Sequence, residues 1–140
     1  MDVTGLVVLL VALAALSLYG LWLRRRDGRV RAAEPGSGPS GWDLADTEPQ
    51  GRRALLLQLS SPACAPCRQT AEVLGSLVAA DAGLAHVEVD VAEHQDVART
   101  LGVLRTPTTV VFDAEGAEVL RVSGVPRVDE LTPALPHPGT

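Results

Sequence analysis

Two cysteines separated by two residues, Cys64 and Cys67, are the side chains in this sequence best suited to chemistry, and the chain has no others. This spacing brings both sulfurs within reach when the first cysteine starts a helix and the second lies one turn inside it. The free N–H groups and the positive dipole at a helix start stabilise a thiolate on Cys64 and lower its pKa. The pair therefore predicts a dithiol that can close into a disulfide, with Cys64 as its nucleophile.

The residues after the first cysteine fit a helix with one buried face. Pro66 stands in the first turn, where the N–H that proline lacks has no partner to lose. Cys67 shares a helical stripe with three apolar residues, Ala71, Leu74 and Val78. We therefore expect Cys67 to be the buried thiol that resolves a mixed disulfide.

Two other uses of the cysteine pair are open. As a zinc or copper module, Cys64 and Cys67 would need further ligands, for which His86 and His94 are the candidates. The sequence has no second pair of cysteines at this spacing and no closely spaced pair of histidines, so we expect no metal. A non-catalytic adaptor that uses the fold for protein contacts is the other alternative. Disulfide exchange itself needs no cofactor, and we expect none.

The hydrophobic pattern predicts the elements that position the dithiol. Residues 54–59 are an apolar run interrupted by Gln58, which is typical of a buried central strand that ends just before the cysteines. A helix is predicted over residues 64–80. Residues 84–91 then alternate with a period of two, which predicts a second strand with His86 on its less apolar face.

The second half of the chain continues the pattern. A short helix is predicted over residues 93–101, and two strands, 108–112 and 117–122, flank a hairpin turn. A terminal helix over residues 125–135 is cut by Pro133. The order strand, helix, strand, helix, strand, strand, helix predicts an α/β domain with a mixed sheet flanked by helices. In such a sheet the site lies in the loop after the first strand, where the cysteines stand.

An apolar segment precedes this domain. Residues 3–23 carry no charge and are long enough, as a helix, to cross a hydrocarbon core of about 30 Å. A cleaved signal peptide is the alternative, but the segment is long for one, lacks a basic start and has no convincing cleavage site. Tyr19 and Trp22 suit the membrane interface, and five arginines within residues 24–31 place the domain in the cytoplasm by the positive-inside rule. An extracytoplasmic domain is the alternative orientation.

Charge divides the chain in the same way. Residues 24–31 have a net charge of +4, whereas residues 32–140 hold seven arginines against fifteen acidic side chains. This acidic balance disfavours nucleic-acid binding.

We expect a transmembrane helix at residues 3–23, an Arg-rich juxtamembrane segment and flexible linker at 24–51, the α/β domain at 52–135 and a frayed tail at 136–140. The Gly/Ser/Pro-rich stretch 34–41 is the predicted flexible part of the linker.

Across residues 52–135 the chain resembles the thioredoxin-like superfamily, and within it the membrane-anchored thioredoxin-domain proteins of bacteria. The resemblance rests on short matches: Cys64-Ala65-Pro66-Cys67-Arg68, Glu88-Val89-Asp90, Leu101-Gly102-Val103, Thr106-Pro107-Thr108 and Gly116. It implies a single-pass protein of the bacterial plasma membrane, held in lipid by residues 3–23. Its partners would be protein or small-molecule disulfides and, as electron donor, a reductase or another membrane protein.

The resemblance also implies roles for the residues near the dithiol. In the family the matching proline is cis and lies against the cysteines, so Pro107 would keep the site open to a substrate disulfide. The backbone of Thr106 would pair with the substrate chain. Arg68 either adds positive potential or is only a solvated helix residue. Ala65 and Pro66 resemble the Gly-Pro pair of reducing thioredoxins, which favours a reductase.

Four positions depart from the family, and the chain also lacks a clear initial strand and helix, for which residues 42–45 are the candidate remnant. Ala63 replaces the usual aromatic residue before the first cysteine, and Ser60 stands where another tryptophan is common. Gln58 stands where a buried acid normally helps to deprotonate the second cysteine, and His86 stands where the lysine partner of that acid is found. One hypothesis is that His86 substitutes for the acid, because imidazole titrates near neutral pH. A structural or exposed strand histidine is the alternative.

Overall fold

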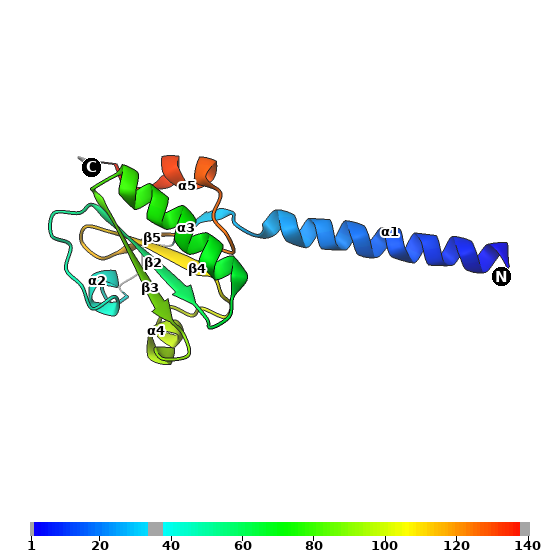
Figure 1. Cartoon of the computed structure of the whole chain (residues 1–140), viewed down its shortest axis with the longest axis horizontal. Coiled ribbons are helices and arrows are strands. Elements are labelled where there is room, and N and C mark those ends of the chain that lie inside the picture. The colour runs from blue at the N-terminus through cyan, green and yellow to red at the C-terminus, as the bar shows by residue number, and fades with distance from the viewer. Residues whose placement is uncertain (1, 34–37, 138–140) are drawn as a thin grey trace.

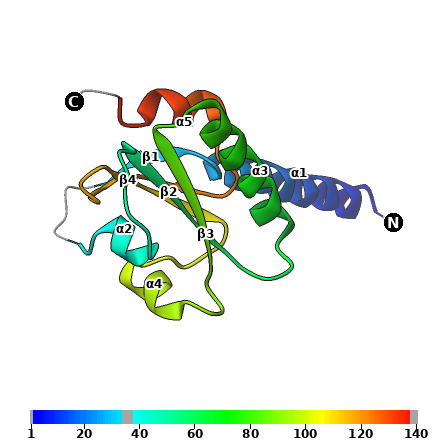
Figure 2. The same ribbon diagram turned by 60° about the vertical axis from the view of Figure 1, so that its left-hand side comes forward.

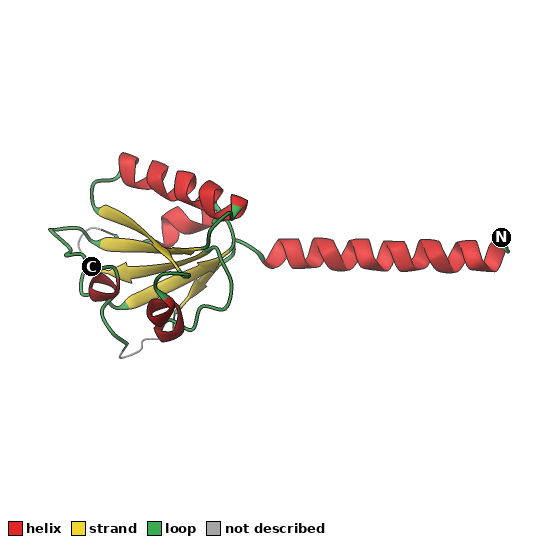
Figure 3. Cartoon of the chain, turned by 60° about the horizontal axis from the view of Figure 1, so that its bottom comes forward, coloured by secondary structure: helices red, strands yellow, loops and turns green. Residues whose placement is uncertain are grey.

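The computed structural model describes residues 2–33 and 38–137 (Figure 1). The helices are α1 (Val3–Arg26), α2 (Gly41–Leu44), α3 (Ala65–Ala80), α4 (Gln95–Thr100) and α5 (Val128–Ala134). The strands are β1 (Val30–Ala32), β2 (Ala54–Ser60), β3 (Leu84–Asp90), β4 (Thr108–Asp113) and β5 (Glu118–Ser123). The helix α1 projects from one edge of a domain that the other elements form (Figures 1 and 3).

The strands form one mixed sheet in the order β1-β5-β4-β2-β3. β2 runs parallel to β3, and α3 makes the crossover that a parallel pair requires. β4 is antiparallel to both β2 and β5, and β5 is antiparallel to β1. The predicted mixed sheet flanked by helices is confirmed.

Helices cover both faces of the sheet, with α3 and α5 on one side and α2 and α4 on the other (Figure 2). All seven residues of β2 are buried, because alternate side chains face opposite layers. Leu55, Leu57 and Leu59 join the core under α2 and α4. Leu56 joins the core under α3 and α5. This burial on both faces explains why the sequence of β2 is a continuous apolar run.

The terminal helix is shorter than predicted. α5 begins at Val128, whereas the sequence pattern predicted a start near Val125. Val125 precedes Pro126, and a residue before proline is disfavoured in the helical region, which accounts for the later start. Pro133 does not cut the helix, because it lies in the last turn, where it removes one hydrogen bond at most.

Two elements precede Arg52, where we expected the domain to begin. β1 pairs with β5, with Val30 opposite Val122. In α2, Trp42 is 4% exposed and its Nε1 donates a hydrogen bond to the carbonyl of Asp113 at 2.9 Å. A three-residue strand and a one-turn helix are too short to produce a periodic signal, so the sequence pattern did not reveal β1 and indicated α2 only as a remnant at residues 42–45.

Parts of the predicted linker and tail lie outside the described residues, namely 34–37 and 138–140. Pro136, which the sequence analysis placed in a frayed tail, is held in the structure. Its carbonyl accepts a hydrogen bond from Arg53 Nε at 2.7 Å. Arg53 also forms an ion pair with Asp81, and the guanidinium and the backbone N–H of Gly83 lower the pKa of Asp81 to about 2.

Among the described residues α1 is the one helix long and apolar enough to cross a membrane, with a mean hydropathy of 2.5 and no residue buried against the domain. The rings of Tyr19 and Trp22 stack at 6.0 Å near its C-terminal end, and the Arg26 guanidinium lies 3.8 Å from the Trp22 ring centroid. Only residues 27–29 separate α1 from β1.

Candidate active site

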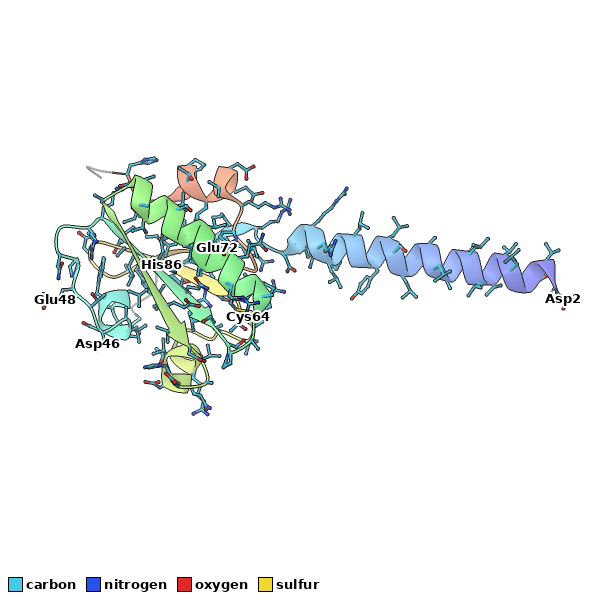
Figure 4. All side chains as sticks on the ribbon, in the orientation of Figure 1. Asp2, Asp46, Glu48, Cys64, Glu72 and His86 are labelled. Atoms are coloured by element: carbon cyan, nitrogen blue, oxygen red, sulfur yellow. A yellow bond between two sulfur atoms is a disulfide. The ribbon has the colours of Figure 1, made fainter. Side chains whose placement is uncertain are left out.

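The two cysteines lie in the loop and first turn that follow β2. Cys64 is the N-cap of α3, and Pro66 is in its first turn. The structure joins Cys64 and Cys67 in a disulfide with their Cα atoms 5.2 Å apart. The backbone N–H of Cys67 also donates to Cys64 Sγ at 3.2 Å, so a free N–H of the helix start points at the first sulfur. Figure 4 shows Cys64 at the end of α3 nearest to α1.

The two sulfurs differ in access. Cys67 is 2% exposed and shares its buried stripe with Thr70 and Leu74, whereas Cys64 is half-buried. Of the two sulfur-bearing residues, Cys64 is therefore the one more accessible to solvent. Ala71 and Val78 flank the same stripe and are half-buried.

A groove lies beside the dithiol, next to Pro107. The Thr106–Pro107 peptide bond is cis, as the resemblance implied. Thr106 Oγ1 lies 2.8 Å from Ser61 Oγ, which ties the proline loop to the loop that carries the cysteines. The groove has a volume of about 460 Å³ and is lined by Arg24, Asp27, Pro66, Gln69, Arg105, Thr106, Pro107, Gly124 and Val125. We call it the Pro107 groove.

Gln58 connects the dithiol to the far strand of the sheet. Its side chain is fully buried, and its Nε2 donates to the Cys67 carbonyl at 2.8 Å and towards Glu88 Oε1 at 3.4 Å. Its Oε1 lies 3.0 Å from His86 Nε2. Because the Cys67 carbonyl and the Glu88 carboxylate only accept, they fix the amide orientation, and His86 Nε2 must carry a proton and donate to Gln58.

His86 thus lies on the Gln58 side of the sheet, as the alternation predicted, but its described contact is with Gln58 and not with a sulfur. Burial lowers the pKa of His86, and the nearby Glu88 carboxylate opposes this shift. The imidazole is therefore neutral at pH 7, with Nδ1 as the nitrogen that can accept a proton.

We expect His86 to make the protein less stable in mild acid. The pKa of His86 is lower in the folded chain than in the unfolded chain. Below about pH 6.5 the unfolded chain therefore binds more protons, and the free energy of unfolding decreases as the pH is lowered. In His86→Gln this loss between pH 7 and 5 should be smaller than in the unmodified protein. Urea unfolding at both pH values measures the difference, and equal losses in the two proteins would contradict the assignment.

The remaining expected site residues are on the surface. Ala65 and Arg68 are exposed on the first turn of α3, and the side chain of Arg68 makes none of the described contacts with the dithiol. Among the described residues, no group of three or more His, Cys, Asp or Glu side chains gathers where it could hold a metal ion. His86, one of the candidate metal ligands, contacts Gln58 instead.

Sequence reasoning missed three positions that shape the Pro107 groove. Gly124, at φ +88°, donates its N–H to the Pro107 carbonyl at 2.8 Å and lines the groove beside it. A glycine two residues after a predicted strand was the available signal. Arg105 and Asp27 form an ion pair at 2.9 Å although they are 78 residues apart in the sequence, and no local sequence pattern predicts such a contact.

The sheet order, the dithiol in the first turn of α3 and the cis proline beside it define a thioredoxin fold. Residues 41–137 match the sequence model of the family described as "Thioredoxin-like domain", and the chain belongs to this family. Such a fold with a Cys64–Cys67 pair suggests a thiol–disulfide oxidoreductase.

Individual relatives agree with this assignment. A stretch of 75 residues, 52% of this chain, is 36% identical to an NADPH-dependent thioredoxin reductase from Arabidopsis thaliana, and the match spans only 14% of that protein. A thioredoxin variant from Halobacterium salinarum has a similar structure, with 30% identity and a TM-score of 0.54 over 60% of this chain and 73% of its own. A thioredoxin from Nicotiana alata shows 28% identity and a TM-score of 0.56 over 71% of this chain and 94% of its own.

Proposed function

We propose that the protein is a membrane-anchored thiol–disulfide oxidoreductase that reduces disulfides through Cys64 and Cys67. The observation that carries this proposal is the half-exposed Cys64 at the N-terminus of α3, disulfide-bonded to a buried Cys67 and bordered by the Pro107 groove. The backbone of Thr106 pairs with the substrate chain, and Pro107 keeps the groove open beside the sulfurs.

The proposed reaction starts from the reduced dithiol. The Cys64 thiolate attacks one sulfur of the substrate disulfide and releases the other as a thiolate, which leaves a mixed disulfide. Cys67 then attacks the Cys64 sulfur and releases the substrate, so two electrons pass to the substrate and the Cys64–Cys67 disulfide forms. A dithiol donor, either a soluble reductase system or another membrane protein, restores the reduced state.

The experiment that tests the function is an equilibrium redox titration of the full-length protein in detergent. Glutathione or dithiothreitol buffers set the potential, and alkylation of free thiols reports the fraction reduced. A two-electron couple near the value of about −270 mV found for thioredoxin supports a reductase. A couple near −120 mV would instead indicate an oxidant, and no reversible couple would contradict the proposal.

We also propose that His86, through Gln58, positions Cys67, and that the charge on the imidazole changes how readily Cys67 loses its proton to solvent before it attacks. Support comes from the contact chain His86–Gln58–Cys67 and from the neutral imidazole at pH 7. His86→Ala should slow reduction of a small disulfide by less than about 100-fold, the lower end for direct acid–base catalysis, because His86 does not touch the sulfur.

The pH profile separates this positioning role from a loss of structure. His86→Ala should remove an inflection below about pH 6.5 in the rate of release of the mixed disulfide. His94→Ala is the matched control, since His94 is exposed at the N-cap of α4 and should leave the profile unchanged. An unchanged profile in His86→Ala would contradict this role of His86.

We propose further that α1 anchors the domain in the bacterial plasma membrane, with the domain in the cytoplasm. Its 24 residues and the arginines at Arg24–Arg26 support this placement. The N-terminus of the protein in the membrane fraction tests the anchor. If the chain there still begins near residue 2, α1 is an anchor, whereas a chain that begins after α1 has lost a cleaved signal sequence. A phosphatase fused to the C-terminus should be inactive, because it works only outside the cytoplasm.

A further inference from the structure

One wall of the Pro107 groove comes from the end of α1. Arg24, in the last turn of α1, and Asp27 line this groove together with Pro66, Pro107 and Gly124. The groove therefore borders the dithiol loop on one side and the end of the candidate membrane span on the other. In Figure 4 the Cys64 end of α3 faces the place where α1 enters the domain.

Specific contacts hold the junction between α1 and the domain. The Asp27 carboxylate accepts a hydrogen bond from Arg105 Nη2 at 2.9 Å, and the N–H of Gly28 donates to the Ser123 carbonyl at 2.7 Å. Gly28 has φ +75°, and a Cβ there would lie 2.2 Å from the Val125 carbonyl oxygen. The backbone at Gly28 therefore packs directly against a turn that lines the Pro107 groove.

The connection is also too short to let the domain move far from the membrane. Four Cα steps lead from Arg26 to Val30, and an extended chain covers about 14 Å in that length. Val30 is already paired with Val122 in the sheet. The Gly/Ser/Pro-rich stretch that was expected to act as a flexible tether follows β1, so it does not separate the sheet from α1.

Basic side chains surround the same junction. A cavity of about 510 Å³ adjoins the Pro107 groove through Asp27 and Arg105 and is also lined by Arg26, Arg29 and Arg31. Arginines at the end of a membrane span are attracted to anionic headgroups, by about 1 kcal/mol each near the surface. This attraction keeps the Pro107 end of the domain at the level of the headgroups.

We propose that the Pro107 groove binds an extended segment of a second membrane protein, whose disulfide lies close in sequence to that protein's own membrane span. This inference rests on the proposed oxidoreductase function and on anchoring by α1. A chain that emerges from the bilayer beside α1 meets the groove directly. A disulfide that a bulky soluble domain holds far from the membrane does not reach the groove directly, because the bilayer next to the groove limits the approach of that domain.

The exchange with this partner is balanced in thiols and electrons. Cys64 bonds to one sulfur of the partner's disulfide and frees the other sulfur as a thiolate. Cys67 then breaks the bond between Cys64 and the partner, which leaves two partner thiols and the Cys64–Cys67 disulfide. Protein reduced beforehand with dithiothreitol supplies the two electrons for one turnover.

The test uses full-length, pre-reduced protein in phosphatidylcholine vesicles with some anionic phosphatidylglycerol. Two single-span reporter peptides carry the same disulfide loop, one about five and one about thirty residues from the apolar segment, which places the second up to about 100 Å along the chain. Alkylation of new thiols gives the single-turnover rates. We expect the near reporter to react at least about tenfold faster than the far one, because anchoring sets the local concentration.

A spacer separates fixed placement from simple tethering. A flexible Gly/Ser segment of about 16 residues inserted between Arg26 and Asp27 adds a mean reach of about 20 to 24 Å and keeps the contacts of Asp27 and Gly28. The near-to-far ratio should then fall at least about threefold. The matched control carries the same insertion between Ala114 and Glu115, in the turn between β4 and β5, and should keep the original ratio.

The possible outcomes distinguish a failure of this inference from a failure of the proposed oxidoreductase function on which it rests. A ratio that the Arg26–Asp27 spacer leaves unchanged, or a far reporter that reacts as fast as the near one, overturns the inference. A small water-soluble disulfide is assayed with each protein, and all three should reduce it. If none of them reduces it, the proposed function itself fails, and if the protein does not float with the vesicles, the anchoring that the inference needs is absent.

Discussion

Replacing Cys64 with serine is expected to reduce disulfide turnover at least about a thousandfold, because the substitution removes the more accessible of the two thiols. Cys67 cannot take over, since it is 2% exposed and faces the core beneath α3. The measurement is the rate of reduction of a small disulfide by the full-length protein. A Cys64→Ser variant that kept most of its rate would contradict the assignment of Cys64 as the attacking residue.

The complementary variant separates attack from resolution. Cys67→Ser keeps the half-exposed Cys64 but has no second thiol to release the substrate, so it should accumulate a mixed disulfide at Cys64. Non-reducing gels and mass spectrometry detect that species, and dithiothreitol should reverse it. If Cys64→Ser trapped the substrate and Cys67→Ser did not, the two roles would be exchanged.

The arrangement of the two cysteines was predictable because it depends on local features. The spacing of Cys64 and Cys67, the apolar run of β2 and the position of Pro66 define a helix start after a buried strand. The same local reasoning placed His86 on the Gln58 side of the sheet, since strand alternation needs no tertiary information. The donor and acceptor roles in the pair were not predictable, because they follow from the Cys67 carbonyl, to which Gln58 donates in the folded chain.

Features that join distant segments were beyond sequence reasoning. The Asp27–Arg105 ion pair and the pairing of β1 with β5 depend on where the whole sheet closes, and three-residue elements carry no periodicity. The predicted flexible linker illustrates the consequence. Its composition was read as a tether after the membrane span, but β1 lies before it and joins the sheet first. The Gly/Ser/Pro-rich stretch therefore connects β1 to α2 within the domain and does not connect the membrane span to the domain.

The second large effect is expected at Trp42, which stands in the segment before the predicted start of the domain. Trp42 packs against a core that includes Leu55, Leu57 and Phe112, and its indole N–H donates to the Asp113 carbonyl. Trp42→Ala should lower the free energy of unfolding by about 3 to 5 kcal/mol, because it empties a buried aromatic site. Urea unfolding followed by far-ultraviolet circular dichroism measures this loss in the chain from residue 27 onward.

Two comparisons make the Trp42 prediction specific. Trp42→Phe keeps a buried ring but loses the indole donor, so it should cost less than Trp42→Ala, and the lost hydrogen bond should account for about 1 kcal/mol of its own cost. A fragment that starts at Arg52 lacks both β1 and Trp42 and should be less stable than Trp42→Ala in the chain from residue 27. If that fragment unfolded at the same urea concentration as the longer chain, residues 27–51 would be a dispensable linker and the core contact of Trp42 would contribute nothing to stability.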